Sequence, residues 1–325
     1  MSAPAVSVCV ATFRRPDRLG RLLACLGENE APPGGFEVVV VDDGSPVDDG
    51  VAGVLAEAGR ELAAKGICMR SARQGRNRGP GAARNVAWRM AAGEWIAFTD
   101  DDCRPDRKWL VSLLDAARGK PAQVVVGRTV PDPDRVDLLG LPFSRSVAVD
   151  GMTGYFHTCN ILYPRGLLDR LGGFDEEFRL IGDDTDLGWR AQEAGASLSY
   201  CPAAIVVHDV VVGDWHSDLR SRRRWADVVR VIAKHPGARR LAWRPYVYRR
   251  SHLPILGIAV LMPALLAGRA GRVLFTGAVG VLLAGDMLRA GSLAGARAKM
   301  QGRVSDAYEV ALLVEASWRQ GALLL

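Results

Sequence analysis

Gly93–Asp102, with the sequence GEWIAFTDDD, is the stretch of this 325-residue chain that decides the fold. The apolar run Trp95–Thr99 is typical of a strand buried on both faces, and it leads directly into three consecutive aspartates. A strand that ends in carboxylates places them at an edge of its sheet, where ligands bind in open α/β folds. The sequence therefore predicts a buried strand with an acidic carboxyl end.

Apolar runs alternate with amphipathic helices on both sides of this stretch. Further strands are predicted at Val6–Val10, Val38–Val41, Ile67–Met69, Val124–Gly127 and Ile205–Val207. Helices are predicted around Leu19–Leu26, Val51–Leu62, Ala82–Met90, Trp109–Leu114 and Leu187–Ala194. Residues 132–156 contain Pro133 and Pro142, directly after Pro131, and are predicted as an irregular region over the site. This alternation predicts an α/β fold with a mainly parallel central sheet and helices on both faces.

A second acidic turn, Asp42-Asp43-Gly44-Ser45, follows the strand at Val38–Val41. A carboxylate here can accept a hydrogen bond from a base N–H or a ribose hydroxyl; the alternative is an Asx-type turn with no ligand. Dinucleotide-binding folds also carry an acid at this point, but they need a glycine-rich turn after the first strand. The chain has Ala11-Thr12-Phe13-Arg14 there, which disfavours a dehydrogenase.

Two acidic clusters suit the chemistry of a phosphate-bearing substrate. Asp100, Asp101 and Asp102 offer the oxygen ligands that Mg²⁺ or Mn²⁺ prefers, and a cation would relieve their mutual repulsion. The alternative for them is a solvated turn or a helix cap. Asp183, Asp184 and Asp186 open a predicted helix, where capping alone explains one carboxylate but not three in four positions.

Basic and histidine residues near these clusters have two interpretations each. His208 ends the last predicted strand, as either a structural histidine or a ligand on the acidic side of the sheet. A basic group precedes and enters the Ala82–Met90 helix, as surface charge or as phosphate contacts. Its members are Arg73, Arg76, Arg78 and Arg84.

Five segments in fixed order and spacing, from about residue 5 to 210, resemble glycosyltransferase family 2 with its GT-A fold. They are Val6–Phe13 (VSVCVATF), Glu37–Ser45 (EVVVVDDGS), Arg76–Asn85 (RNRGPGAARN), Gly93–Asp102 (GEWIAFTDDD) and Gly172–Arg190 (GGFDEEFRLIGDDTDLGWR). The resemblance implies an inverting transferase that uses a divalent cation and a nucleotide-sugar donor.

The resemblance also implies roles for individual residues. Phe13 and Asp43 would contact the nucleotide base, and Asp43 would accept from a uracil-like N–H, which favours UDP- or dTDP-sugars. Asp100 and Asp102 match the DxD motif, with Asp102 as the chief metal ligand and His208 completing the metal site. The cofactor-binding residues expected beside Phe13 and Asp43 are Arg84, Asp100 and Asp101.

Asp184 matches the family's general base. Asp183 stands where the family usually has Glu, a departure that bears on acceptor contacts. Two other functions were weighed. A sugar-phosphate nucleotidyltransferase usually carries a glycine-rich basic loop after its first strand, which Arg14 and Arg15 only approximate. A non-catalytic glycan- or lipid-binding protein is expected to have lost one of the two key acids, and both are present.

The region after the last strand has a different composition. We expect a catalytic domain at 1–213, a basic region at 214–252, an apolar hairpin at 253–290 and a C-terminal helix at 291–325. Leu253–Ala267 and Val273–Ala284 are each shorter than the roughly 20 residues of a spanning helix. A shallow hairpin at the cytoplasmic face of the cell membrane is predicted, with a spanning pair or a buried pair at a homodimer interface as alternatives.

Composition sets further limits. From residue 218 to 250 the chain carries ten Arg and one Lys against two Asp, next to apolar sequence, which favours attraction to anionic lipid over nucleic acid. The six cysteines form no CxxC pair or spaced Cys/His set, which argues against zinc. No signal peptide is visible before the first strand, so a cytoplasmic location is expected. A wall polysaccharide or other glycan, a lipid-linked sugar and a small molecule all remain open as acceptor.

Overall fold

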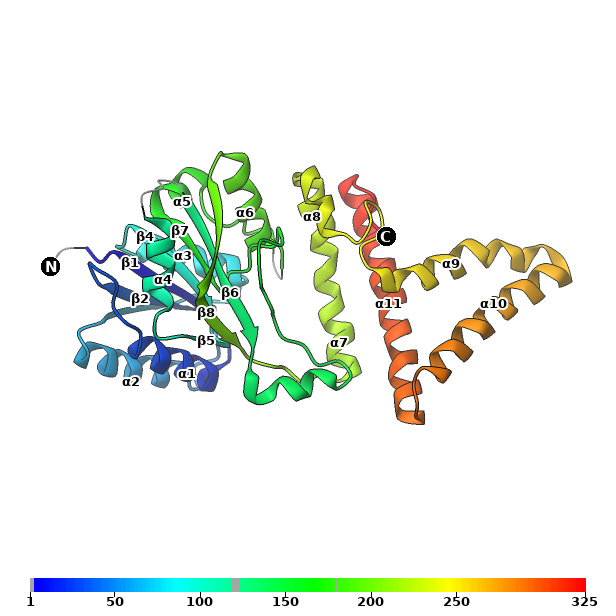
Figure 1. Ribbon diagram of the computed structural model, residues 1–325, viewed down its shortest axis with the longest axis horizontal. Coiled ribbons are helices and arrows are strands. Elements are labelled where there is room, and N and C mark those ends of the chain that lie inside the picture. Colours follow the sequence, from blue (N-terminus) through cyan, green and yellow to red (C-terminus); the bar gives the residue numbers. More distant parts are fainter. Residues whose placement is uncertain (1–2, 119–122, 179–180) are drawn as a thin grey trace. The chain divides into compact units, whose positions relative to one another are not determined.

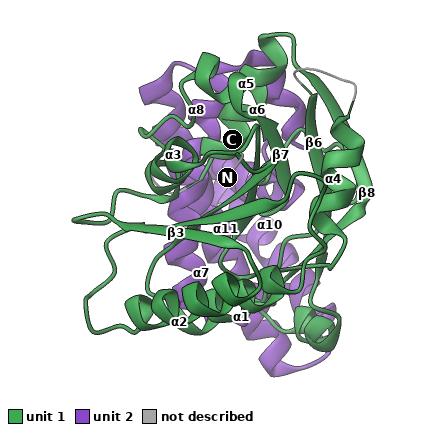
Figure 2. Ribbon diagram, turned by 90° about the vertical axis from the view of Figure 1, so that its left-hand side faces the viewer, with its two compact units in different colours: residues 1–211 green, residues 212–325 purple. Residues whose placement is uncertain are grey.

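The computed structural model describes residues 3–118, 123–178 and 181–325. The chain forms two compact units, Met1–Val211 and Val212–Leu325, which Figure 2 distinguishes by colour.

Unit 1 is built on one eight-stranded sheet with the order β3-β2-β1-β4-β7-β6-β8-β5 (Figure 1). Its strands are β1 Val6–Thr12, β2 Phe36–Asp42, β3 Cys68–Arg73, β4 Trp95–Asp100, β5 Cys103–Pro105, β6 Gln123–Pro131, β7 Ile161–Pro164 and β8 Ser197–His208. Its helices are α1 Pro16–Gly27, α2 Val51–Ala64, α3 Pro80–Met90, α4 Trp109–Ala117, the 3₁₀ helix η1 Pro133–Gly140, α5 Arg165–Leu171 and α6 Asp183–Glu193. This confirms the predicted α/β class.

The two halves of the sheet differ in strand direction. The strands β3, β2, β1 and β4 run parallel, as predicted. By contrast, β7 is antiparallel to both β4 and β6, and β5 is antiparallel to β8. Neither β5 nor β7 was predicted, because each is short and ends in a proline, which is atypical of a strand interior.

Alternation along the strands fixes which side of the sheet each helix covers. Val6, Val8 and Val10 of β1 belong to one hydrophobic cluster with the buried residues of α1, α2 and α4. Successive side chains of a strand point to opposite faces, so the residues between them face the other side, where α3 packs against β1 and β2. Helices therefore cover both faces of this part of the sheet, so the strand ends are the expected place for a site.

Unit 2 is helical. It contains α7 Trp215–Arg222, η2 Arg223–Trp225, α8 Ala226–Lys234, η3 Pro236–Leu241, η4 Arg250–His252, α9 Leu253–Leu261, η5 Met262–Leu266, α10 Gly268–Leu288 and α11 Leu293–Gln320. The sequence predicted two short apolar segments separated by an arginine-bearing turn. Instead α10 begins at Gly268, so that Arg269 and Arg272 lie inside a helix of 21 residues.

By length and composition alone, α10 can cross a membrane. The most apolar 18-residue window of α10 has a mean hydropathy of 1.4, and 11% of that window is buried inside the protein. The helical stretch before it, Arg250–Leu266, is apolar but shorter than a membrane span. The two therefore differ in length, which the sequence pattern did not indicate.

Candidate active site

The acidic clusters meet because their strands are neighbours in register. Thr12 at the end of β1 pairs with Asp42 of β2, and Ala11 pairs with Asp100 of β4. Parallel strands end on the same edge of a sheet, so the acids that follow β2 and β4 share that edge. The structure thus brings together the two turns that the sequence singled out.

Arg84 joins two of the acidic clusters. This buried side chain lies on α3 and donates to Asp100 at 2.7 Å and to Asp183 at 2.9 Å. Burial opposes ionisation of Asp100, but the Arg84 guanidinium outweighs it and holds the pKa of that carboxyl below its usual value. Arg84 is thus an internal bridge between β4 and α6, and its predicted contact with a phosphate stays a prediction.

The aspartates of the triple cluster point in different directions. Asp101 is buried and accepts from the Thr12 hydroxyl at 2.8 Å and from Arg15 at 2.9 Å, which ties β4 to the end of β1. Burial is the main reason that its pKa is raised. Its predicted cofactor contact is untested, and its partners in the structure are internal.

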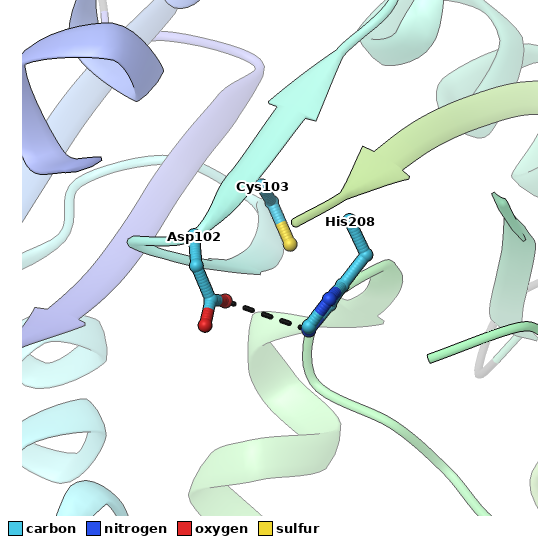
Figure 3. Close-up of side chains that lie close together, drawn as sticks. All are labelled: Asp102, Cys103 and His208. Atoms are coloured by element: carbon cyan, nitrogen blue, oxygen red, sulfur yellow. Dashed lines mark ion pairs between the residues drawn. The ribbon is translucent and has the colours of Figure 1, made fainter. Parts of the chain in front are cut away.

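Asp102 faces His208, as Figure 3 shows. The Asp102 Oδ1 atom lies 3.5 Å from His208 Nε2, because β5 begins directly after Asp102 and pairs with the end of β8. His208 Nδ1 lies 2.9 Å from the carbonyl oxygen of Asp209. An Nδ1–H that donates to this carbonyl leaves the Nε2 lone pair directed at Asp102. A carboxylate oxygen and an imidazole nitrogen so arranged fit a divalent cation.

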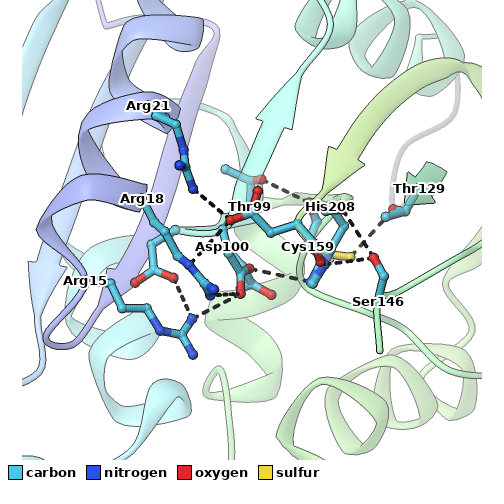
Figure 4. A network of polar contacts seen from close by, with 12 residues as sticks. Arg15, Arg18, Arg21, Thr99, Asp100, Thr129, Ser146, Cys159 and His208 are labelled. Carbon is cyan, nitrogen blue, oxygen red and sulfur yellow. Dashed lines mark hydrogen bonds and ion pairs between the residues drawn. The ribbon is translucent and has the colours of Figure 1, made fainter. Parts of the chain in front are cut away.

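A row of arginines on α1 was not predicted. Arg15 and Arg18 lie 3.1 and 3.3 Å from Asp102 Oδ2, and Arg21 lies 2.8 Å from Asp209 (Figure 4). Their spacing of three residues puts them on one side of the helix that follows β1. That spacing, next to a strand end, was the signal available in the sequence. The row balances the negative charge of the strand edge.

Asp184 lies in the first turn of α6. Its Oδ1 accepts from the Thr185 backbone N–H at 2.7 Å, and its Oδ2 lies 4.0 Å from His157 Nδ1. Burial raises the pKa of Asp184, and it raises the pKa of the adjacent Asp183 to about 6. Burial also lowers the pKa of His157 to about 4, so that this imidazole is neutral at pH 7. His157 was not predicted, because it lies in an irregular segment.

Asp43 organises the loop that leads into α3. Its two carboxylate oxygens accept from the backbone N–H groups of Arg78, at 2.8 Å, and Gly79, at 2.9 Å. Gly44 has a φ of +78°, and a Cβ there would lie 2.5 Å from the Arg76 carbonyl carbon, so this close approach requires glycine. Phe13 lies half-buried just after β1. Base recognition by Phe13 and Asp43 remains a prediction.

Comparison with known proteins agrees with this geometry. Residues 7–171 match the profile described as "Glycosyl transferase family 2", and residues 135–284 match "Glycosyl transferase family group 2". The first match covers half of the chain. The chain belongs to glycosyltransferase family 2. It is therefore a transferase, as the named glycosyltransferases among its relatives also support.

Individual relatives cover different shares of the chain. The pre-mycofactocin glycosyltransferase of Mycobacterium tuberculosis is 30% identical over 56% of this chain and 39% of its own length. The succinoglycan biosynthesis protein ExoU of Rhizobium meliloti is 30% identical over 67% of this chain and 66% of its own. This chain therefore spans less than two thirds of each of these two relatives.

Solved structures agree on the fold. A mannosyltransferase from Pyrobaculum calidifontis, in complex with GDP-Man and Mn²⁺, is 23% identical with a TM-score of 0.65, covering 98% of this chain and 88% of that one. S. aureus TarS in complex with UDP-GlcNAc is 18% identical with a TM-score of 0.53, covering 98% of this chain and 92% of that one. At these identities the likeness shows the shared fold.

Proposed function

We propose that this enzyme transfers a sugar, with inversion, from a nucleoside diphosphate sugar to an acceptor hydroxyl, assisted by Mg²⁺ or Mn²⁺. The observation that carries the proposal is the convergence of Asp100, Asp102, Asp184 and His208. Arg84 contacts both Asp100 and Asp183, which directly precedes Asp184, and the negative charge of Asp100 helps to raise the pKa of Asp184. His208 faces Asp102. Sugar transfer needs a cation site and a base near one another, and this cluster offers both.

Asp102 and His208 would hold the cation, with Asp100 as a further oxygen ligand. Their chemistry fits, since Oδ1 of Asp102 and Nε2 of His208 face each other at 3.5 Å. When bound, the cation would neutralise the diphosphate leaving group. Arg15 and Arg18, next to Asp102, add positive charge on the same side of the sheet.

Asp184 would act as the general base. Its raised pKa makes it a stronger base than an exposed carboxylate, and the neutral state of His157 keeps a positive charge from lowering that pKa. Asp184 removes the proton of the acceptor hydroxyl, whose oxygen attacks the anomeric carbon from the face opposite the leaving group. This single displacement inverts the anomeric centre and needs no covalent enzyme intermediate.

The proposed donor is a sugar nucleotide whose base is uracil or thymine. Asp43 is the supporting residue, because each of its oxygens has a second lone pair beyond the bond from Arg78 or Gly79. The two solved neighbours were studied with GDP-Man and UDP-GlcNAc, so both base types occur with this fold. The choice here therefore depends on the loop around Asp43.

The acceptor is proposed to be a glycan, a lipid-linked sugar or a small molecule handled at the cytoplasmic face of the cell membrane. The apolar, exposed surface of α10 supports membrane attachment through unit 2. Within unit 2, residues 214–252 would form the basic region, 253–290 the inserted hairpin and 291–325 the closing helix. A homodimer that covers α10 is the alternative to attachment.

The test uses the full chain, purified in detergent, with a panel of UDP-, GDP- and dTDP-sugars and added Mn²⁺. Release of a nucleoside diphosphate that stops with excess chelator is the expected result, and NMR of the product should show an inverted anomeric centre. Release of pyrophosphate from a nucleoside triphosphate and a sugar phosphate would instead identify a nucleotidyltransferase. Retention of configuration would overturn the proposed displacement.

A further inference from the structure

Cys103 lies beside the proposed cation ligands Asp102 and His208. In the antiparallel pair of β5 and β8, Cys103 is directly opposite His208. Opposite residues of an antiparallel pair project to the same face of the sheet, so these side chains are neighbours. The Cys103 sulfur, a carboxylate oxygen of Asp102 and a ring nitrogen of His208 all lie within 4.8 Å of one another (Figure 3).

The oxygen and nitrogen donors are also held in suitable orientations. The carbonyl of Asp209, at 2.9 Å from Nδ1, fixes His208 so that Nε2 faces Asp102. Arg15 and Arg18 contact the Oδ2 atom of Asp102, whereas Oδ1 faces the histidine. One sulfur, one nitrogen and one oxygen donor are thus gathered from β5, β8 and the turn between β4 and β5.

This donor set differs from the one that a hard cation prefers. Mg²⁺ and Mn²⁺ take carboxylate, carbonyl and water oxygens, while a thiolate with an imidazole favours Zn²⁺ and similar softer ions. Three protein ligands with a fourth position open is a geometry that Zn²⁺ adopts readily.

We propose that Cys103 makes this centre a binding site for a soft divalent cation, in which Zn²⁺ is held by Cys103 Sγ, Asp102 Oδ1 and His208 Nε2. As the sulfur–metal bond forms, the thiol proton leaves to solvent, and no electron is transferred. The inference rests on the proposed function in one respect: Zn²⁺ competes with the hard cation because the two share Asp102 and His208. Soft cations are therefore inhibitors, and Cys103 sets the metal selectivity.

The cysteine spacing in the sequence argued against zinc, and the fold explains why it could not reveal this site. Cys103 and His208 are far apart along the chain and come together only because β5 pairs with β8. Spacing rules find ligands that share a short loop, not ligands assembled by strand pairing.

Cobalt spectroscopy of the full chain tests the ligand set without using activity. Addition of Co²⁺ to the wild-type protein should produce a sulfur-to-cobalt charge-transfer band in the near ultraviolet. Cys103→Ser should remove the band. Cys68→Ser, a change at an exposed thiol, is the control and should retain it. Absence of the band in the wild-type protein, or its loss only in Cys68→Ser, would overturn the proposal even if Cys103→Ser fails to fold.

Inhibition by Zn²⁺ provides the second measurement. In the Mn²⁺-supported reaction, Cys103→Ser should raise the Zn²⁺ concentration for half-inhibition by about tenfold or more, as expected for loss of a metal-site partner. The two proposals fail separately. A charge-transfer band without transferase activity would support the soft-cation site and contradict the proposed function. Mn²⁺-dependent transfer without the band would support the proposed function and contradict the soft-cation site.

Discussion

The sheet edge of unit 1 and the helix α10 of unit 2 distribute charge in opposite ways. Unit 1 buries its large apolar side chains, with Trp109 and Phe98 fully buried, and gathers acids and arginines at the strand ends. In α10, Val281 is 75% exposed and Leu288 is 85% exposed. Unit 2 also buries a cluster of charged groups: Glu309 is 0% exposed and receives ion pairs from Arg222 and Arg249.

The difference separates two tasks of the protein. An aqueous domain that performs charge chemistry needs its ionised groups where a polar substrate can reach them. A helix that exposes valines and leucines to water gains free energy only when something apolar covers it. Asp286 near the end of α10, with a bidentate pair to Arg303 at 2.8 and 3.0 Å, anchors that helix to α11. Changes in one region should therefore leave the other's property intact.

The largest effect is expected at the cation site. Asp102→Ala should lower turnover by a factor on the order of 10⁴, because a bound cation contributes several kcal/mol to a transition state with a charged leaving group. Chelator should do the same to the wild-type enzyme. Asp115→Ala, at an exposed carboxylate of α4, is the control and should keep full turnover. Membrane partition should be unchanged in both variants. Full turnover in excess chelator would contradict a role for the cation.

The second largest loss of turnover is expected at the general base, Asp184. Asp184→Asn keeps the shape of the side chain but cannot take a proton, so turnover should fall by a factor of roughly 10²–10⁴. Donor affinity, measured by calorimetry, should stay near the wild-type value, and Asp169→Asn on the surface of α5 provides a matched change. If Asp184→Asn keeps most of its turnover, Asp183 or Asp186 becomes the candidate base.

The two regions also differ in how much of their structure could be predicted from the sequence alone. Long buried strands with acids at their ends, such as Trp95–Asp100, were recognisable because pattern and motif coincide. His157 and Cys103 were not recognisable as site residues, because an irregular segment carries the first and a three-residue strand the second. The ligand contacts expected of Arg84 and Asp101 stay predictions, but the sequence could not indicate their ion pairs with Asp183 and Arg15, because these arise from packing that only the fold supplies.

The boundary of α10 was also beyond the sequence pattern. Arg269 and Arg272 suggested a turn between two short segments, since charges usually end an apolar run. Helix hydrogen bonding does not depend on the polarity of the side chain, so these arginines occupy the first two turns of one continuous helix. Polarity patterns thus locate apolar surface better than they locate helix ends.

A charge placed on α10 tests whether this helix attaches the protein to a membrane. Val281→Arg should weaken membrane partition of the full chain by about 100-fold, since arginine in the middle of a membrane helix costs about 2.5–3.5 kcal/mol. Flotation with vesicles that contain anionic lipid measures this partition. Val314→Arg, at an exposed valine of α11, should have a much smaller effect. Turnover on a soluble donor should be unchanged in both. Equal partition of Val281→Arg and wild type would favour a water-exposed or dimeric α10.

The smallest effect is expected for nucleotide affinity, and it tests the role of Asp43 at the sheet edge. UDP and CDP have rings of the same size, but uracil presents an N–H donor where cytosine presents an acceptor. If Asp43 accepts a hydrogen bond from that N–H, UDP should bind about tenfold more tightly than CDP, because a hydrogen bond to a charged group is worth about 1.5–3 kcal/mol. Asp43→Asn will also weaken the bonds from Arg78 and Gly79, which loosens the start of α3 for both nucleotides alike. The ratio of the two affinities cancels that common loss, so calorimetry on both ligands isolates base recognition. A wild-type ratio near one would remove Asp43 from the nucleotide site and leave it as the residue that holds the α3 loop in place.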